Sequence, residues 1–164
     1  VSGLWLSTDK LIIEIFPKNE DRYVWKDHLD RALGGDDQAF DVALSHCPSA
    51  LEEAHVRCER ANRLFMNEKY IEAGNEYAFT DAPFEEICLN FLEFGQEDGL
   101  MEYLKGKLKL MSRDSNKTQH SMLCTWLMEL YLRALGKSSE SYKIEEELRL
   151  FMANNSDSLI PAVT

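Results

Sequence analysis

The sequence predicts an all-α fold, an irregular α-solenoid of antiparallel helical hairpins that follows a short β-prone N-terminal segment. From Asn19 onward, apolar residues recur at the i, i+3, i+4 and i+7 positions that make up one face of a helix. The connections between these stretches are short, and short links make neighbouring helices antiparallel. A spacing motif also recurs along the helical part. Together these observations predict a row of helical hairpins.

Residues 1–17 differ from the rest of the chain. LWLS (Leu4 to Ser7) and KLIIEIF (Lys10 to Phe16) are rich in strand-favouring residues and flank the turn pair Thr8-Asp9, and Pro17 closes the segment. A lone two-stranded ribbon is only marginally stable in water. We therefore expect residues 1–17 to belong to an upstream β domain that this chain lacks.

Boundary signals define three helices in the next part of the chain. Gly34-Gly35 ends the first helix, and a second begins near Asp36 and ends at Pro48. Ser49 and Glu52 have the spacing of a capping box, so a third helix begins there. The apolar stripes of these helices are Trp25, His28, Leu29, Ala32 and Leu33; Ala39, Phe40, Ala43, Leu44 and Cys47; and Leu51, Ala54, Cys58, Ala61 and Phe65.

Five further helices follow. Asp81 is the expected N-cap of the fifth helix with Pro83 in its first turn, and Gly95 ends it. SRDSNKTQ (residues 112–119) is an expected polar loop, and Gly136 closes the seventh helix. The stripes of helices four to eight are Tyr70, Ala73, Tyr77 and Ala78; Phe84, Ile87, Cys88, Phe91 and Leu92; Leu100, Tyr103, Leu104, Leu108 and Met111; Leu123, Trp126, Leu127, Leu130, Tyr131 and Ala134; and Ile144, Leu148, Phe151 and Met152.

The seventh helix has an unusually wide apolar face. Met122, Leu132 and Leu135 extend its stripe, so we expect both sides of this helix to be covered. After the eighth helix the sequence becomes polar and is expected to fray. The chain is thus predicted to divide into a β-prone segment (1–17), an α-solenoid (18–154) and a flexible tail (155–164).

Three of the expected helices open with related spacing. A small residue inside the motif lets a partner helix approach, and a bulky residue one turn away fills the groove. The offsets are near the period of roughly 34 residues in tetratricopeptide repeats but irregular, as in the looser clathrin-heavy-chain type of solenoid. The motifs are Phe40-x-x-Ala43-x-x-x-Cys47, Tyr70-x-x-Ala73-x-x-x-Tyr77 and, in degenerate form, Glu97-x-x-Leu100-x-x-x-Leu104.

Net charge argues against several classes of partner. The chain carries 29 acidic and 18 basic residues, a net charge of −11. Nucleic acid needs a basic surface, and direct adsorption to anionic lipid is disfavoured for the same reason. No apolar run approaches the roughly 18 residues that span a membrane, and no signal peptide is visible. We expect neither nucleic-acid binding nor direct membrane insertion.

The four cysteines lie far apart at apolar helical positions. The disulfide framework of a secreted protein usually has a smaller chain and denser cysteines. We therefore expect Cys47, Cys58, Cys88 and Cys124 to be reduced, buried residues of a cytosolic protein.

Two sets of residues contain groups that catalyse reactions or bind metals elsewhere. Ser45-His46-Cys47 has the residue types of a nucleophilic site, but adjacent residues fan around a helix and are not expected to converge. His55 and Cys58 share a helix face and, with His46 and Cys47, could supply four zinc ligands. The tight, repeated ligand pairs of structural zinc sites are missing, so we favour an edge histidine and a core cysteine.

The remaining candidates also favour structural roles. Glu85-Glu86 and Asp36-Asp37 are neighbours at helix starts, where they complement the helix dipole, whereas an acid–base pair must face across a cleft. No phosphate-binding glycine motif is present, which argues against a nucleotide. The stripe aromatics Trp25, Phe91, Trp126 and Tyr131 are expected in the core. Asn116-Lys117-Thr118 and Asn154-Asn155-Ser156 match a glycosylation pattern that matters only in a secreted protein.

Four stretches carry a resemblance to a known family over roughly Leu4 to Gly136. The most specific is the block Tyr-x-x-Ala-x-x-x-Tyr-Ala-x-Thr followed by Phe-Glu-Glu-Ile. The stretches RYVWKDHLD (22–30), FDVALSHC (40–47), EKYIEAGNEYAFTDAPFEEICLNFLE (68–93) and TWLMELYLRALG (125–136) resemble the vacuolar protein sorting-associated protein 18, or Deep orange, family. The segment after Gly136 has no match of this kind.

The resemblance implies a fold and a role. Family members have an N-terminal β-propeller, a long α-solenoid and a C-terminal RING zinc domain, so residues 1–17 would be the last propeller strands. The RING cysteines have no counterpart here, and no zinc or other cofactor is implied. The implied role is that of a scaffold subunit in the HOPS and CORVET complexes, which tether membranes before fusion in endosome-to-vacuole or lysosome transport.

The implied partners are the sister subunits of the class C core, with an indirect link to SNAREs and Rab GTPases. The implied location is the cytosolic face of late endosomes and of the vacuole or lysosome, as a peripheral protein. The resemblance does not indicate which residues bind a partner, and no small-molecule substrate is implied.

Two other classes of function have different requirements. A tetratricopeptide-like peptide-binding adaptor needs basic residues on its concave face. Only Lys105, Lys107 and Lys109 come close, and the first and last of these share a helix face. An enzyme needs a convergent site, and no catalytic, cofactor-binding or metal-binding residue can be assigned.

Overall fold

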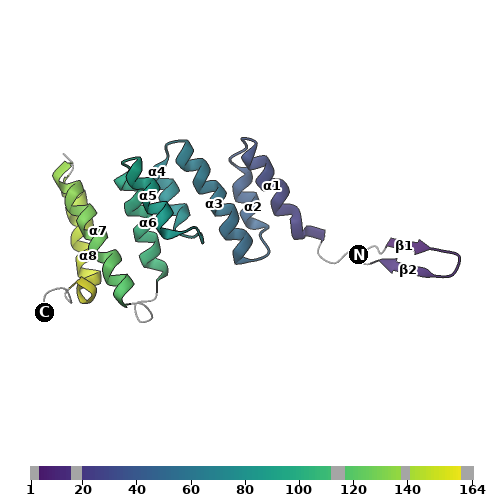
Figure 1. Cartoon of the computed structure of the whole chain (residues 1–164). Helices are drawn as coiled ribbons and strands as arrows, with labels where there is room; N and C mark the ends of the chain where they lie inside the picture. The colour runs from purple at the N-terminus through teal and green to yellow at the C-terminus, as the bar shows by residue number, and fades with distance from the viewer. Residues whose placement is uncertain (1–3, 16–19, 112–116, 138–140, 160–164) are drawn as a thin grey trace. The chain divides into compact units, whose positions relative to one another are not determined.

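A computed structural model describes residues 4–15, 20–111, 117–137 and 141–159 of the chain (Figure 1). It divides into two compact units, Val1–Val56 and Arg57–Thr164, which are described separately. The predicted all-α architecture with a β-prone N-terminal segment is confirmed.

The N-terminal segment is a β-hairpin. Strands β1 (Leu4–Ser7) and β2 (Ile12–Ile15) pair antiparallel, with Ser7 opposite Ile12. The loop between them is closed by Thr8, whose backbone N–H and hydroxyl both donate to the Leu11 carbonyl, at 2.8 and 3.0 Å. The second strand is therefore shorter than predicted, because Lys10 and Leu11 lie in the loop.

The helical part of the first unit consists of a 3₁₀ turn, η1 (Glu20–Tyr23), and helices α1 (Val24–Leu33) and α2 (Ala39–Ser45). Helix α1 ends in a Schellman motif: Asp36 N–H bonds the Arg31 carbonyl, and Gly35 N–H bonds the Ala32 carbonyl with Gly35 at φ 119°. The predicted glycine stop is therefore confirmed. The unit has its own core of Trp25, Leu29, Ala32, Ala39, Phe40, Ala43 and Val56.

Helix α3 (Ala50–Met66) begins where the capping pattern predicts. The Ser49 hydroxyl accepts a hydrogen bond from Leu51 N–H at 3.3 Å and donates to the Glu52 carboxylate. The hydrogen bond from Ser49 holds the pKa of Glu52 below its usual value. One donor at the helix start is thus satisfied by the side chain that the sequence indicates.

The second unit contains the last part of α3 and five further helices: α4 (Tyr70–Tyr77), α5 (Phe84–Glu93), α6 (Glu97–Leu110), α7 (Lys117–Lys137) and α8 (Ser141–Leu159). Helix α4 packs closely against α6, and α7 lies side by side with α8 (Figure 1). The predicted stripe positions meet in one core, which includes Ala73, Tyr77, Ile87, Phe91, Leu100, Tyr103, Leu104, Leu127, Leu130 and Tyr131.

Several predicted boundaries are wrong in detail. The N-cap of α5 is Pro83, not Asp81. The Pro83 carbonyl accepts the N–H of Ile87 at 3.2 Å, and proline has no N–H of its own to satisfy. The residues 117–119, predicted as loop, form the start of α7, while residues 112–116 lie outside the described part.

Four predicted stripe residues are exposed: Leu33, Leu51, Leu92 and Met152. The faces of α1, α3, α5 and α8 that pack against neighbours are thus narrower than the apolar pattern suggested.

The C-terminal helix extends beyond the boundary predicted at residue 154. Helix α8 reaches Leu159, with a kink at Asn155 (φ −125°, ψ 20°). The Asn155 side-chain amide donates to the Phe151 carbonyl at 2.9 Å, the group that a helical backbone N–H would otherwise bond. The sequence predicted the end of the helix near the kink at Asn155, but it did not predict that the helix continues to Leu159.

Candidate functional site

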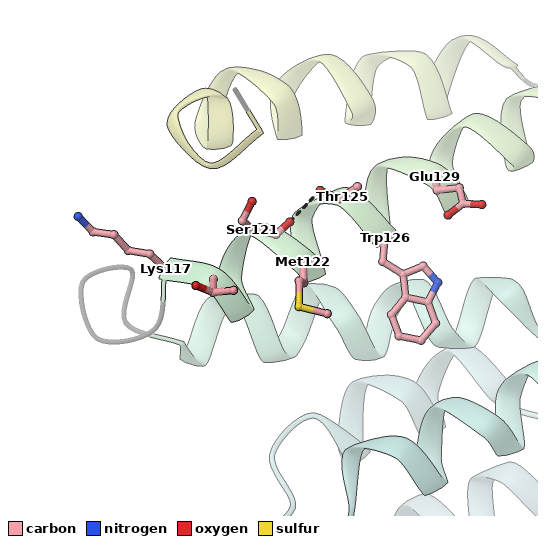
Figure 2. A pocket seen from close by; sticks show the side chains of 7 residues that line it. Lys117, Ser121, Met122, Thr125, Trp126 and Glu129 are labelled. Carbon is pink, nitrogen blue, oxygen red and sulfur yellow. Dashed lines mark hydrogen bonds between the residues drawn. The ribbon is translucent and has the colours of Figure 1, made fainter. Parts of the chain in front are cut away.

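An apolar groove runs along α7 in the second unit. It consists of two adjoining cavities of about 650 and 720 Å³, which share Met122 and Trp126. Figure 2 shows these two side chains pointing from α7 to the same side, with Lys117 and Glu129 towards the ends of the first cavity. The second cavity continues to Phe84 of α5 and to Lys107 and Met111 at α6. We call this surface the α7 groove.

Aromatic contacts fix one wall of the groove. The Trp126 ring meets Phe84 edge to face with centroids 6.2 Å apart, and Phe84 stacks on Tyr103 at 5.7 Å. Tyr103 is fully buried, whereas Phe84 and Trp126 are half-buried. Rings held in this way offer a rigid apolar surface. Met122, by contrast, is 68% exposed and can adapt its shape to a ligand.

The charged groups of the groove are not equivalent. Glu129 is paired with Arg133 at 2.6 Å. Lys107 is half-buried and donates to the Thr80 carbonyl at 2.9 Å. Burial lowers the pKa of Lys107, and the Asp81 carboxylate opposes that shift. No carboxylate of a described residue lies within ion-pair distance of Lys107 or Lys117.

The three lysines considered for peptide binding do not form one basic face. Lys105 bonds Glu102 at 2.9 Å and Glu147 at 3.1 Å, so its charge is neutralised within the unit. Lys105 and Lys109 line the same cavity of about 250 Å³, as their shared face predicts. Lys107 lies instead at the α7 groove. Of the three, only Lys107 presents a cation to this groove.

The Ser45-His46-Cys47 stretch differs from the prediction. Ser45 and His46 do approach, with Oγ and Nδ1 3.0 Å apart, whereas we expected them to fan apart. Both bond the same acceptor, since the Val42 carbonyl lies 2.7 Å from Ser45 Oγ and 2.9 Å from His46 Nδ1. An Nδ1 that donates to a carbonyl cannot also accept the Ser45 proton. Cys47 Sγ donates to the Ala43 carbonyl at 3.3 Å, so this geometry closes a helix end and does not activate a nucleophile.

The zinc-type residues have separate surroundings. His46 contacts the ring of His28 at 5.7 Å, and the exposed His55 meets Trp25 edge to face at 6.1 Å. Cys58 packs against the core of the second unit. Within the described ranges, no group of three or more His, Cys, Asp or Glu side chains is placed to hold a metal ion.

The cysteine prediction is correct for two residues. Cys88 and Cys124 are buried, but Cys47 and Cys58 are half-buried, and all four are free thiols. Burial, with a smaller effect of the Glu85 charge, raises the pKa of Cys88 to about 12. Such a thiol is mostly protonated at neutral pH and is a poor nucleophile.

The other candidates have structural surroundings. Glu85 and Glu86 are exposed in the first turn of α5. Asp36 precedes α2 and pairs with Arg31 at 3.0 Å. The aromatics Trp25, Phe91 and Tyr131 are buried as predicted, but Trp126 is only half-buried and lines the groove.

The two glycosylation patterns fall differently with respect to the structure. Asn116 lies outside the described residues. Asn154 and Asn155 lie in α8, and Asn155 bonds the backbone of its own helix.

The sequence did contain one signal for the α7 groove. The wide apolar face of α7 predicted cover on both sides, yet Met122 and Leu132 are 68% and 55% exposed. The role of Phe84 and Trp126 as groove walls could not be read from their stripe positions, because it depends on how far α5 lies from α7. As for membranes, no described helix is both long and apolar enough to cross one.

Comparison with known proteins gives a consistent result. The family model for the first half of the VPS18 alpha-solenoid domain matches residues 24–164. The vacuolar protein sorting-associated protein 18 homolog of Danio rerio is 35% identical over 163 residues, which cover 93% of this chain and 16% of that protein.

Two further relatives agree. Vacuolar sorting protein 18 of Arabidopsis thaliana is 29% identical over 167 residues (93% of this chain and 16% of that protein). Vacuolar membrane protein pep3 of Schizosaccharomyces pombe is 34% identical over 150 residues (92% and 15%). The chain therefore spans less than a fifth of the length of each of these relatives.

Proposed function

The chain belongs to the VPS18 family, and on that basis we propose that it is a non-enzymatic scaffold segment of a vacuolar protein sorting subunit. The observation that carries the proposal is the match of the solenoid model to residues 24–164, together with animal and plant relatives named for vacuolar sorting and a yeast relative named as a vacuolar membrane protein. The hydrogen bonding of Ser45 and His46 supports a structural role for this pair.

The finer proposal concerns the complex. The segment contributes to the HOPS and CORVET tethering complexes by contacting sister subunits of the class C core, and through them it is linked to SNAREs and Rab GTPases. It acts at the cytosolic face of late endosomes and of the vacuole or lysosome. The net charge of −11 supports access to the membrane through partners, because an acidic surface is repelled by anionic lipid.

The physical support comes from surface composition. Helical hairpins that stack side by side present extended faces for binding partners. In the second unit these faces carry large exposed apolar side chains, among them Leu89 on α5 and Leu150 on α8, at 63% and 60% exposure. A partner that covers such side chains removes apolar surface from water, which favours association.

The proposal is tested by co-purification. The tagged chain serves as bait for each sister tethering subunit, expressed separately, and at least one should be retained. The double variant Leu89→Glu, Leu150→Glu is expected to reduce retention without unfolding the chain, because both side chains are exposed. The scaffold role is wrong if no subunit is retained and if the full-length protein still assembles after deletion of residues 24–164.

A peptide-binding adaptor is the second candidate, and the α7 groove is the observation that favours it. The two functions are compatible, because a scaffold can hold a partner through one short segment.

A further inference from the structure

We propose that the α7 groove binds a short, acidic, amphipathic segment of a partner protein. This inference depends on the proposed scaffold function in one respect: it takes the ligand of the groove to be a protein. The first argument is size: cavities of about 650 and 720 Å³ lie within the range of roughly 300–1,000 Å³ that is typical of ligand sites.

The second argument is the shape of the groove. The lining residues of α7 run from Lys117 to Glu129, which corresponds to about 18 Å along the helix axis. A partner helix of about three turns, or an extended segment of about six residues, covers that length. The walls Phe84 and Trp126 are held by ring contacts, so one apolar side chain of the partner can anchor against them.

The third argument is charge. Of the four charged side chains that line the groove, Glu129 already has Arg133 as its partner. Glu85 lies in the first turn of α5, where the helix dipole favours a carboxylate. Lys107 and Lys117 have no carboxylate partner among the described residues, and Lys107 is half-buried. A carboxylate from a partner would pair with a partly desolvated cation, where salt screens the attraction less than at an exposed site.

These observations select one class of occupant. An apolar anchor alone would fit the walls but leave both lysines unpaired, and a basic segment would bring like charges together at Lys107. An acidic, amphipathic segment satisfies both the walls and the cations. We expect its carboxylates to meet Lys107 and Lys117, and its apolar side chains to contact Met111, Met122 and Trp126.

The test uses the full chain and a designed 16-residue helical peptide. The peptide carries leucine at i, i+3, i+4 and i+7 positions with glutamate at most others. A second peptide has lysine for each glutamate, and a third has serine for each leucine. Binding is followed by NMR of the methionine methyl groups, since Met111 and Met122 line the groove while Met66 and Met152 lie elsewhere.

We expect the acidic amphipathic peptide to shift the Met111 and Met122 signals and the other two peptides to leave them unchanged. Lys107→Gln should weaken binding about tenfold, as for loss of a charged hydrogen bond. Lys109→Gln, on the same helix but away from the groove, should not. Met122→Glu should abolish binding, whereas Leu132→Glu, at another exposed apolar position of α7, should preserve it.

Three results would overturn the proposal: no shift at millimolar peptide, equal binding of the lysine peptide, or equal effects of Met122→Glu and Leu132→Glu. Each of these results is independent of the scaffold role. If Met122→Glu and Lys107→Gln leave co-purification with sister subunits intact while no peptide binds, the groove proposal fails and the scaffold role stands.

Discussion

Gly74 of α4 lies against the backbone of Gly99 in α6, where a Cβ on Gly74 would stand 2.1 Å from the Gly99 carbonyl oxygen. A Cβ on Gly99 would in turn stand 2.7 Å from the Tyr70 carbonyl oxygen. Further along the two helices, a Cβ on Gly106 would stand 2.3 Å from the Cβ of Ala78. Small residues therefore let α4 and α6 approach backbone to backbone, and this seam cannot accept a larger side chain without moving a helix.

The first prediction is that Gly74→Ala lowers the free energy of unfolding by about 1–3 kcal/mol, the usual cost of overpacking. The added methyl group meets a carbonyl, which cannot rotate away as a side chain can. Urea unfolding followed by circular dichroism measures the change.

Gly136→Ala is the matched control. Nothing lies within 4 Å of a Cβ placed on Gly136, so the free energy of unfolding of this variant should rise by about 0.5–1 kcal/mol through helix propensity. Equal effects of the two variants would contradict the close approach of α4 and α6.

The second prediction concerns Glu68, which ends α3 in a left-handed conformation with φ 62°. Its N–H bonds the Phe65 carbonyl and the Lys69 N–H bonds the Leu64 carbonyl, so Glu68 occupies the position that glycine usually takes in a Schellman motif. Glu68→Gly should raise the free energy of unfolding by about 0.5–1 kcal/mol, because glycine adopts this conformation without strain. The melting temperature should rise accordingly.

The counterpart of that variant is Gly95→Ala. Gly95 has φ +67° and open space around its Cβ, so the substitution tests backbone strain without a steric clash. It should destabilise the chain by about 1 kcal/mol. The strain argument would be refuted if Gly95→Ala were neutral and Glu68→Gly destabilising.

These helix ends also show what the sequence could and could not predict. The stops at Gly35 and Gly95 were predicted, because glycine marks a left-handed position. The end of α3 at Glu68 carries no such mark, since the left-handed residue there is a glutamate. Asp81 has the right side chain for an N-cap, but α5 begins two residues too late for it, with Pro83 at the N-cap position.

The candidate site was less accessible to sequence reasoning than the fold. Periodicity assigned Phe84 and Trp126 to an apolar stripe, and both do contact the core. Whether a stripe residue faces a packed neighbour or an open groove depends on the distance between α5 and α7. The periodicity of the sequence gives no information about that distance. The wide apolar face of α7 was the one local sign in the sequence that pointed to the surface around Met122.

The third prediction is that Glu97→Gln lowers the free energy of unfolding by up to about 1 kcal/mol at pH 7, as for a partly exposed ion-pair network. Glu97 at the start of α6 bonds Lys137 at 2.7 Å and lies 3.6 Å from Arg133, both on α7. The hydrogen bond from Lys137 is the main reason that the pKa of Glu97 is lowered.

The pH dependence of this variant has a defined sign. Because the folded pKa is depressed, the stability from Glu97 is present above the unfolded value of about 4.3 and is lost as pH falls through the folded pKa. The difference between wild type and Glu97→Gln should therefore shrink below about pH 4. Urea titrations at several pH values measure it, with the exposed Glu93→Gln as control. If the stability difference between wild type and Glu97→Gln stayed constant down to pH 2, the ionised carboxylate of Glu97 would be excluded as the source of that difference.

The fourth prediction concerns Tyr77, which is buried and donates a hydrogen bond to Asn62 Oδ1 at 2.6 Å. Burial, with smaller effects of Cys58 and nearby glutamates, raises the pKa of Tyr77 to about 12. Tyr77→Phe should cost about 1 kcal/mol at pH 7, because it leaves Asn62 without this donor.

The stability that Tyr77 contributes is fully present below its unfolded pKa of about 10 and is lost as pH rises towards 12. The advantage of wild type over Tyr77→Phe should thus decrease between pH 9 and 11 in thermal unfolding, by about 1 kcal/mol. Tyr142→Phe, at a 70% exposed position, should match wild type at pH 7. An advantage that stayed the same at pH 11 would show that the Tyr77 hydroxyl is not held in its neutral form by the folded chain.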